Sequence, residues 1–159
     1  MRSRLLAGLL GMAWAVGLHA QPLPPGVQLG MGVDALRQAQ PAAEPVRRPE
    51  RLAGGLAGSW RLDHGQVAGV GGAQIFFFAA GQLRRVEFQV DAAGDAAFEQ
   101  LLAWGRQQYG PERPAQDAVS RYAAWSSADT DIYLRLLTGA RGGLSLVISA
   151  RPPRDDRTL

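Results

Sequence analysis

The residue types that carry most enzyme chemistry are scarce in this sequence. It contains no cysteine and no lysine, so all 17 of its basic residues other than histidine are arginines. Without lysine there is no P-loop, no Schiff base and no Ser–Lys dyad. Without cysteine there is no thiol nucleophile, no disulfide framework and no cysteine-based zinc or iron–sulfur site.

His64 is the candidate general base, because the other histidine, His19, lies in an N-terminal segment that we expect to be removed. Such a base needs a nucleophile and an orienting partner. Asp63 is adjacent, but neighbours on a strand point to opposite faces, and Gly65 favours a solvated turn. A periplasmic hydrolase that uses His64 with Asp63 or Glu87 is the alternative function, and it requires His64 to lie in a cleft.

Asp129 and Asp131 have the D-x-D spacing with which a calcium loop can begin. An EF-hand needs further oxygen ligands and a glutamate near position 12, and none falls in register. Aspartates are also common in hairpin turns. The glycines form no G-x-G-x-x-G motif, and no serine stands in G-x-S-x-G. We therefore predict a turn at residues 129–131, no metal site and no cofactor.

Aromatic side chains are the candidates for binding. Tyrosine and tryptophan are enriched among the residues that dominate protein–protein affinity. Most aromatic residues of the chain fall at predicted core positions. We predict Trp60, Trp125 and Tyr133 as binding residues, on the condition for Trp125 and Tyr133 that they lie on the outer face of the sheet.

The N-terminus has the three parts of an export signal. Residues 1–4 are basic, residues 5–18 form an apolar run of fourteen, and a cleavage site ends at Ala20. A membrane-spanning helix needs about 20 apolar residues, and no cysteine follows for a lipid anchor. We expect residues 1–20 to be a signal peptide and the mature protein to be periplasmic or secreted, with no stable membrane anchor.

Loss of the signal peptide changes the charge of the chain. The formal charge is +3 for the whole sequence, and removal of Arg2 and Arg4 leaves +1. Binding to a polyanion needs clustered positive charge. The densest arginine cluster, between residues 47 and 51, is interrupted and flanked by glutamates. We therefore expect no nucleic-acid partner.

Proline and glycine divide the remaining chain into elements. Residues 21–29, with three prolines, indicate an extended leader. Residues 33–40 are typical of a short helix that Pro41 ends. Residues 41–59 indicate a long surface loop, and residues 151–159 a charged tail.

The strand pattern is clearest in one hairpin. Residues 73–78 are apolar on both faces, which predicts a central strand covered on both sides. The chain turns at residues 80–81, and residues 83–90 return with strict alternation. The shorter predicted strands comprise residues 60–63, with 66–70 as an extension, 120–127, 132–137 and 144–150.

The second predicted helix covers residues 95–109 and ends at Gly110-Pro111. An apolar stripe runs along it. Gly105 lies within this stripe, which predicts a close approach of the helix to the sheet. Asp95 is the expected N-cap.

These elements predict an α+β fold with a mainly antiparallel sheet and two helices packed on one face. A single domain spans residues 30–150. Its halves, 30–92 and 93–150, each contain a helix ended by proline, then a tryptophan and a hairpin. A tandem α-β-β-β duplication explains this order, as does the ordinary order of hairpins in an α+β domain.

The Leu-Gly-Met of residues 29–31, the short helix and the Gly-Gln-Leu-Arg-Arg-Val of residues 81–86 resemble the pattern of SmpA/OmlA-type envelope proteins over residues 27–90. The beta-lactamase inhibitory proteins contain a tandem version, to which residues 95–150 are similar. The resemblance implies a non-enzymatic domain that binds other proteins. The chain lacks the lipobox cysteine of the first group and the cysteine pairs of the second, so no functional residue is transferred.

The sequence thus predicts an exported, non-enzymatic protein-binding module of the bacterial envelope, of the accessory, inhibitor or immunity type. Its partner would be another envelope or secreted protein. The sequence specifies no oligomeric state.

Overall fold

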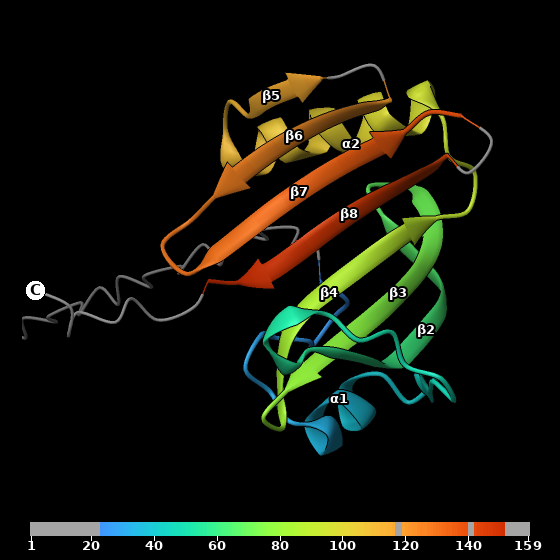
Figure 1. The fold of residues 1–159 in the computed structure, drawn as a ribbon, viewed down its shortest axis with the longest axis vertical. Coiled ribbons are helices and arrows are strands. Elements are labelled where there is room, and N and C mark those ends of the chain that lie inside the picture. The colour runs from blue at the N-terminus through green and yellow to red at the C-terminus, as the bar shows by residue number, and fades with distance from the viewer. Residues whose placement is uncertain (1–22, 117–118, 140–141, 152–159) are drawn as a thin grey trace, which may run out of the picture.

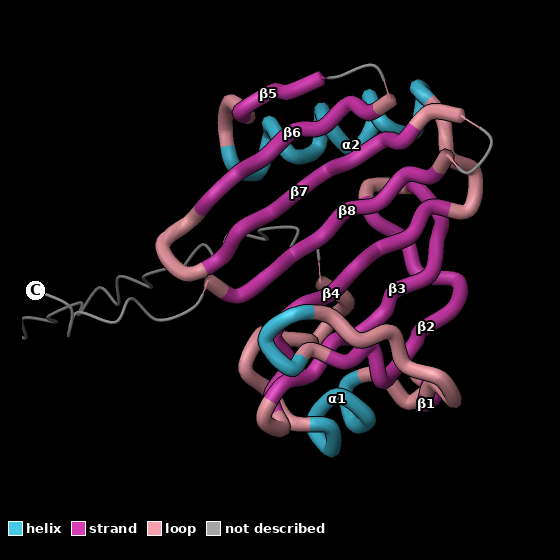
Figure 2. Tube along the Cα trace, in the orientation of Figure 1, coloured by secondary structure: helices cyan, strands magenta, loops and turns pink. Residues whose placement is uncertain are grey.

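Eight antiparallel strands form one continuous sheet in the computed structural model, which describes residues 23–116, 119–139 and 142–151 (Figures 1 and 2). The order across the sheet is β1-β2-β3-β4-β8-β7-β6-β5. This arrangement confirms the α+β class with a mainly antiparallel sheet. The predicted signal peptide and nearly all of the predicted tail lie outside the described residues.

The elements follow one another along the chain as helix, strands, helix, strands. The strands are β1 (Glu44–Pro45), β2 (Ala57–Val67), β3 (Val70–Ala79), β4 (Gln82–Val90), β5 (Arg113–Gln116), β6 (Ser120–Ser126), β7 (Thr130–Leu137) and β8 (Gly143–Ala150). The helices are α1 (Val33–Ala39), α2 (Asp95–Tyr109) and the short 3-10 helix η1 (Ala53–Gly55).

The two halves of the chain contribute to the sheet in mirrored order. In each half a helix is followed by a short edge strand and three longer strands, and β4 of the first half pairs with β8 of the second. A tandem duplication would give this mirrored order, although each half has one strand more than the predicted α-β-β-β unit. The duplication itself stays a prediction.

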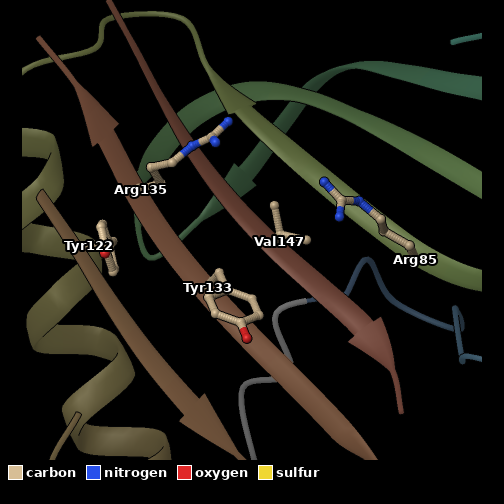
Figure 3. A pocket seen from close by; sticks show the side chains of 5 residues that line it. All are labelled: Arg85, Tyr122, Tyr133, Arg135 and Val147. Atoms are coloured by element: carbon tan, nitrogen blue, oxygen red, sulfur yellow. The ribbon is translucent and has the colours of Figure 1, made fainter. Parts of the chain in front are cut away.

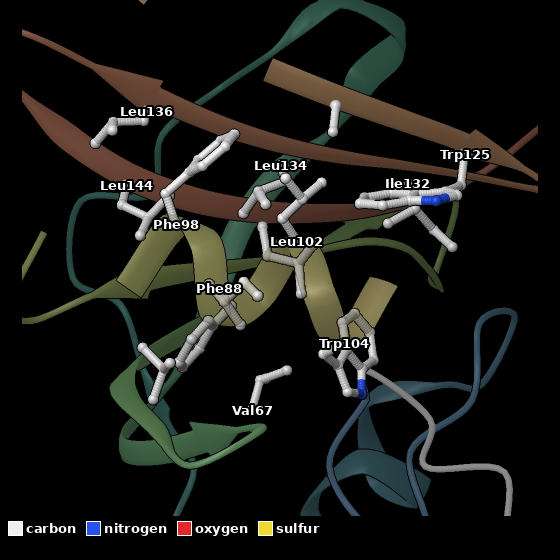
Figure 4. Packing of buried hydrophobic residues seen from close by; sticks show 14 of the residues in the cluster. Val67, Phe88, Phe98, Leu102, Trp104, Trp125, Ile132, Leu134, Leu136 and Leu144 are labelled. Carbon is white, nitrogen blue, oxygen red and sulfur yellow. The ribbon is translucent and has the colours of Figure 1, made fainter. Parts of the chain in front are cut away.

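The larger part of the core lies between α2 and one face of the sheet (Figure 4). The predicted stripe of α2 is buried there, with Phe98, Leu101 and Leu102 at most 6% exposed. Alternate side chains of β4, β6, β7 and β8 meet this stripe. They are Phe88, Ala123, Trp125, Ile132, Leu134, Leu136, Leu144, Leu146 and Ile148.

A second apolar cluster lies between α1 and the first half of the sheet. Leu36 of α1 packs there with Phe76, Phe78 and Val86, which point to the same side of the sheet as Phe88. Both helices therefore cover one face, as predicted. The hairpin of β3 and β4 turns at Ala80 and Gly81, both with positive φ.

The predicted leader of residues 21–29 contributes to the core, beginning with Leu23, the first residue that the structure describes. Leu23 and Leu29 pack against both apolar clusters, and Val27 is 2% exposed. Backbone hydrogen bonds tie the end of this segment to Leu83, which accepts from the Gly30 amide at 2.7 Å. The segment differs from the extended leader that was predicted, because it turns at residues 25–26 and 29–30 and the Val27 amide donates to the Pro24 carbonyl at 3.0 Å. Its apolar side chains bind it to the domain.

Gly105 allows α2 to approach the sheet, as predicted. A Cβ at this position would lie 2.5 Å from Cζ2 of Trp125. The start of α2 differs from the prediction, because the N-cap is Gly94 and not Asp95. The Gly94 carbonyl accepts from the Phe98 amide, while the Asp95 carboxylate binds Arg121 at 3.0 Å.

The edges of the sheet were not predicted. Residues 41–59 contain β1, η1 and the start of β2, where the sequence indicated a surface loop. Backbone bonds to the neighbouring strand order this segment, including Val46 to Ser59 at 2.8 Å. The opposite edge strand, β5, pairs with β6 where the sequence predicted no element, because four residues are too few to show a periodic pattern.

We predict that Gly105→Ala lowers the free energy of unfolding by about 1 kcal/mol. Overpacking a core typically costs about 1–3 kcal/mol, and roughly 1 kcal/mol of this cost is offset because alanine is favoured over glycine in a helix. Urea denaturation followed by tryptophan fluorescence measures the difference. Gly143→Ala is the control, since its Cβ would meet no atom within 4 Å. Unchanged stability of Gly105→Ala would contradict the tight contact.

Candidate functional site

The second face of the sheet is not covered by either long helix. Figure 1 shows α2 behind β6 and β7, while the near side of β6, β7 and β8 is bare. We call this surface the open face. Its side chains are Arg85, Glu87 and Gln89 of β4, Tyr122, Ala124 and Ser126 of β6, Asp131, Tyr133 and Arg135 of β7, and Ser145, Val147 and Ser149 of β8.

A pocket of about 340 Å³ lies in the middle of the open face. It is lined by Arg85, Tyr122, Tyr133, Arg135 and Val147, which come from four adjacent strands (Figure 3). The sheet register places these side chains together, because Tyr122 pairs with Arg135 and Tyr133 pairs with Val147. Cross-strand partners stand about 5 Å apart on the same face.

Val147 of β8 makes the floor of this pocket. Ser145, Val147 and Ser149 alternate on the open face of β8, between longer side chains of β4 and β7. Val147 is 8% exposed, whereas Tyr133 is 46% exposed. The open face is therefore hollow along β8 and raised along β7.

Arg85 lies at one side of the pocket and is held by neighbours of its own half of the chain. Its Nη2 donates to Glu87 Oε2 at 2.9 Å, and its guanidinium lies 5.4 Å from the ring centroid of Phe77. The Nε of Arg85 is buried, and the described residues offer it no hydrogen-bond acceptor. A buried donor without a partner costs free energy.

Asp131 stands at the end of the open face and is neutralised by a local arginine. Arg151 Nη2 donates to its Oδ1 at 2.7 Å, and the Ser126 hydroxyl donates to the same oxygen, also at 2.7 Å. The hydrogen bond from Arg151 is the main reason why the pKa of Asp131 is below its ordinary value, followed by that from Ser126. Asp131 therefore stays ionised down to a lower pH than a free aspartate.

Arg135 has no such partner. Within residues 23–113, 119–139 and 142–151, whose side chains are described, it forms neither an ion pair nor a hydrogen bond. Both carboxylates of the open face, Glu87 and Asp131, are occupied by other arginines. The guanidinium of Arg135 thus adds an uncompensated positive charge beside the pocket.

Of the three predicted binding residues, the structure places one on the open face. Tyr133 is exposed there and lines the pocket. Trp125 does not meet the condition for a binding role, because it is 3% exposed and packs under α2 against Gly105 (Figure 4). Its indole Nε1 donates to the Gly110 carbonyl at 3.0 Å, so its single polar atom is also used inside the domain.

Trp60 lies on the helix-covered side of the sheet, near α1. It is half-buried against the second apolar cluster, and the Arg37 guanidinium lies 5.8 Å from its ring centroid. A hollow of about 720 Å³ adjoins it, lined by Asp34, Arg37, Gln38, Pro41, Ala43, Pro45 and Trp60. Trp60 and Tyr133 therefore belong to different surfaces.

The structure does not bring the hydrolase candidates together. His64 is exposed in a bulge of β2, with a φ of 60°, and it lines neither of the two hollows. Asp63 pairs with Arg61 at 2.7 Å, and Glu87 pairs with Arg85 two strands away. Each carboxylate thus neutralises an arginine of its own strand and does not orient the imidazole.

Neither a metal site nor a membrane-spanning element emerges from the part of the chain that the structure describes. No group of three or more histidine, aspartate or glutamate side chains there could hold an ion. No helix among those residues has the length and apolarity needed to cross a membrane. Comparisons with family models, with curated proteins and with solved structures found no match for this chain.

Sequence reasoning missed Arg85, Tyr122, Arg135 and Val147 as site residues. Alternation along each strand assigns all of them except Val147 to the polar side. Tyr133 and Arg135 alternate with the buried Ile132 and Leu134 in this way. The alternation within each strand therefore indicates which residues share a face. It does not give the register between strands that brings these residues into one pocket.

We predict that Arg151→Gln raises the pKa of Asp131 toward its ordinary value near 3.8, because the strongest hydrogen bond to the carboxylate is removed. With the pKa lowered in the folded state, the contribution of Asp131 to stability is present above pH 4 and is lost as the pH falls through the folded pKa. A carboxyl ¹³C NMR titration measures this pKa. Arg121→Gln, which removes an arginine from the opposite end of β6, should leave it unchanged.

Proposed function

We propose that this protein is an exported, non-catalytic module that binds another envelope or secreted protein through its open face. The observation that carries the proposal is the exposure of Tyr133 at a pocket in a sheet face that the helices leave free. Tyrosine and arginine are enriched at the centres of protein interfaces. Four of the five residues that line this pocket are of these types.

The form of the open face favours a macromolecular partner. Small-molecule sites usually enclose most of their ligand within a cleft. Here both Tyr133 and Arg135 are exposed, and the pocket is a depression in an extended sheet surface. A surface of this kind suits a partner protein whose own surface protrudes into the depression.

Sequence features support export and the absence of catalysis. The N-terminal twenty residues have the parts of a signal peptide, and the chain has no lysine or cysteine. The resemblance to SmpA/OmlA-type and beta-lactamase inhibitory proteins points to the same class of function. An accessory, inhibitor or immunity role fits this description equally well.

Site-specific photocrosslinking tests the proposal. A benzoylphenylalanine at position 133 should crosslink a defined partner in cells that export the protein, whereas the same residue at position 107, exposed on the outer side of α2, should not. Crosslinks that form equally at both positions, or at neither, would contradict the assignment of the open face.

The crosslinked partner then permits a quantitative prediction. Tyr133→Ala should weaken its binding about thirtyfold or more, because truncation of an interface hot spot typically costs at least 2 kcal/mol. Gln107→Ala is the matched control on α2 and should leave affinity unchanged. Surface plasmon resonance with the purified partner measures both. A Tyr133→Ala variant that binds as tightly as the original protein would show that this side chain lies outside the interface.

A further inference from the structure

We propose that the segment of the partner that enters the pocket is acidic: an aspartate or glutamate flanked by apolar side chains, with its carboxylate between Arg135 and Arg85. This inference rests on the proposed function, because the occupant is part of a protein. It names the chemistry that the open face recognises.

The first argument is the charge around the pocket. Arg135 of β7 and Arg85 of β4 line the pocket from the two strands that flank β8 (Figure 3). Two guanidinium groups at the edges of one pocket favour an anion within it. Glu87 accepts from Arg85 through a single nitrogen, and Asp131 is held by Arg151.

The second argument is the unused hydrogen-bonding capacity. Arg135 has no hydrogen bond within the described part of the chain, and the Nε of Arg85 is a buried donor without an acceptor. A carboxylate has two oxygens and accepts up to four hydrogen bonds. Bonds between a guanidinium and a carboxylate are about twice as strong as those between neutral groups. An acidic side chain would therefore give Arg135 an acceptor and would also reach the terminal guanidinium nitrogen of Arg85 that Glu87 leaves unused.

The apolar surroundings define the neighbours of the acidic residue. Val147 forms the floor, and the rings of Tyr122 and Tyr133 stand on the adjacent strands. Tyrosine offers apolar contact area together with a hydroxyl. Apolar residues on both sides of the partner's carboxylate would cover these rings and exclude water, which strengthens the central ion pair.

The same features disfavour a nucleic acid. Polyanion binding needs many phosphate contacts on a strongly positive surface. On the open face Glu87 and Asp131 offset two arginines, and the mature chain has a formal charge of +1 after the loss of Arg2 and Arg4. The single uncompensated arginine, Arg135, therefore fits one carboxylate better than a chain of phosphates.

Two synthetic peptides test the proposal on the mature protein. They are acetyl-Gly-Leu-Glu-Leu-Gly-amide and the same peptide with glutamine in place of glutamate, titrated into ¹⁵N-labelled protein by NMR. We expect shifts at the amides of Tyr133, Arg135 and Val147, and an affinity about fivefold higher for the glutamate peptide, the upper range for an exposed ion pair. Arg135→Gln should remove this preference. Arg48→Gln removes the same charge from an exposed loop position and should preserve it.

Three results would overturn the acidic occupant: equal affinity for the two peptides, a preference that survives Arg135→Gln, or no shift on the open face at millimolar peptide. The photocrosslinking experiment separates this failure from failure of the proposed function. A partner captured at position 133 whose recovery is unaffected by Arg135→Gln would overturn the acidic occupant and leave protein binding through the open face in place.

Discussion

The pairing of β4 with β8 is the contact on which the rest of the structure depends. It joins the last strands of the two halves in a register that sets Val86 opposite Ile148 and Phe88 opposite Leu146. Without it each half would end in an unpaired strand edge, which is prone to pair with other chains. The same register sets Arg85 beside β8 on the open face. The pocket therefore exists only in the joined sheet, because Arg85 comes from one half and its other residues from the other.

The elements that the sequence predicted are those with their own periodic pattern. The hairpin of β3 and β4 and the buried stripe of α2 follow from alternation of two and of 3.6 residues, and Gly105 was rightly read as a close approach. The edge strands β1 and β5 have two and four residues, too few for a pattern. Their structure is imposed by the neighbouring strand, and the burial of Leu23 is likewise imposed by tertiary packing.

The site was predictable one strand at a time but not as a whole. Tyr133 was identified because it is aromatic and stands among alternating residues. Trp125 was misplaced because residue type alone does not tell an exposed hot spot from a core ring, and its contact with Gly105 is set by how α2 packs on the sheet. Arg85 and Arg135 lie more than forty positions apart in sequence. Only the order β4-β8-β7 brings them to one pocket.

The two halves of the sheet differ in what lies over the open face, and this difference explains where the pocket is. In the first half Phe77 points to the open face but is fully buried. Arg85 lies over its ring, Gly58 leaves room beside it, and η1 passes in front of β3 (Figure 1). The second half has no equivalent of η1 among its described residues. The side chain of Tyr133 therefore remains uncovered, and the half that lacks this cover is the half that can accept a partner.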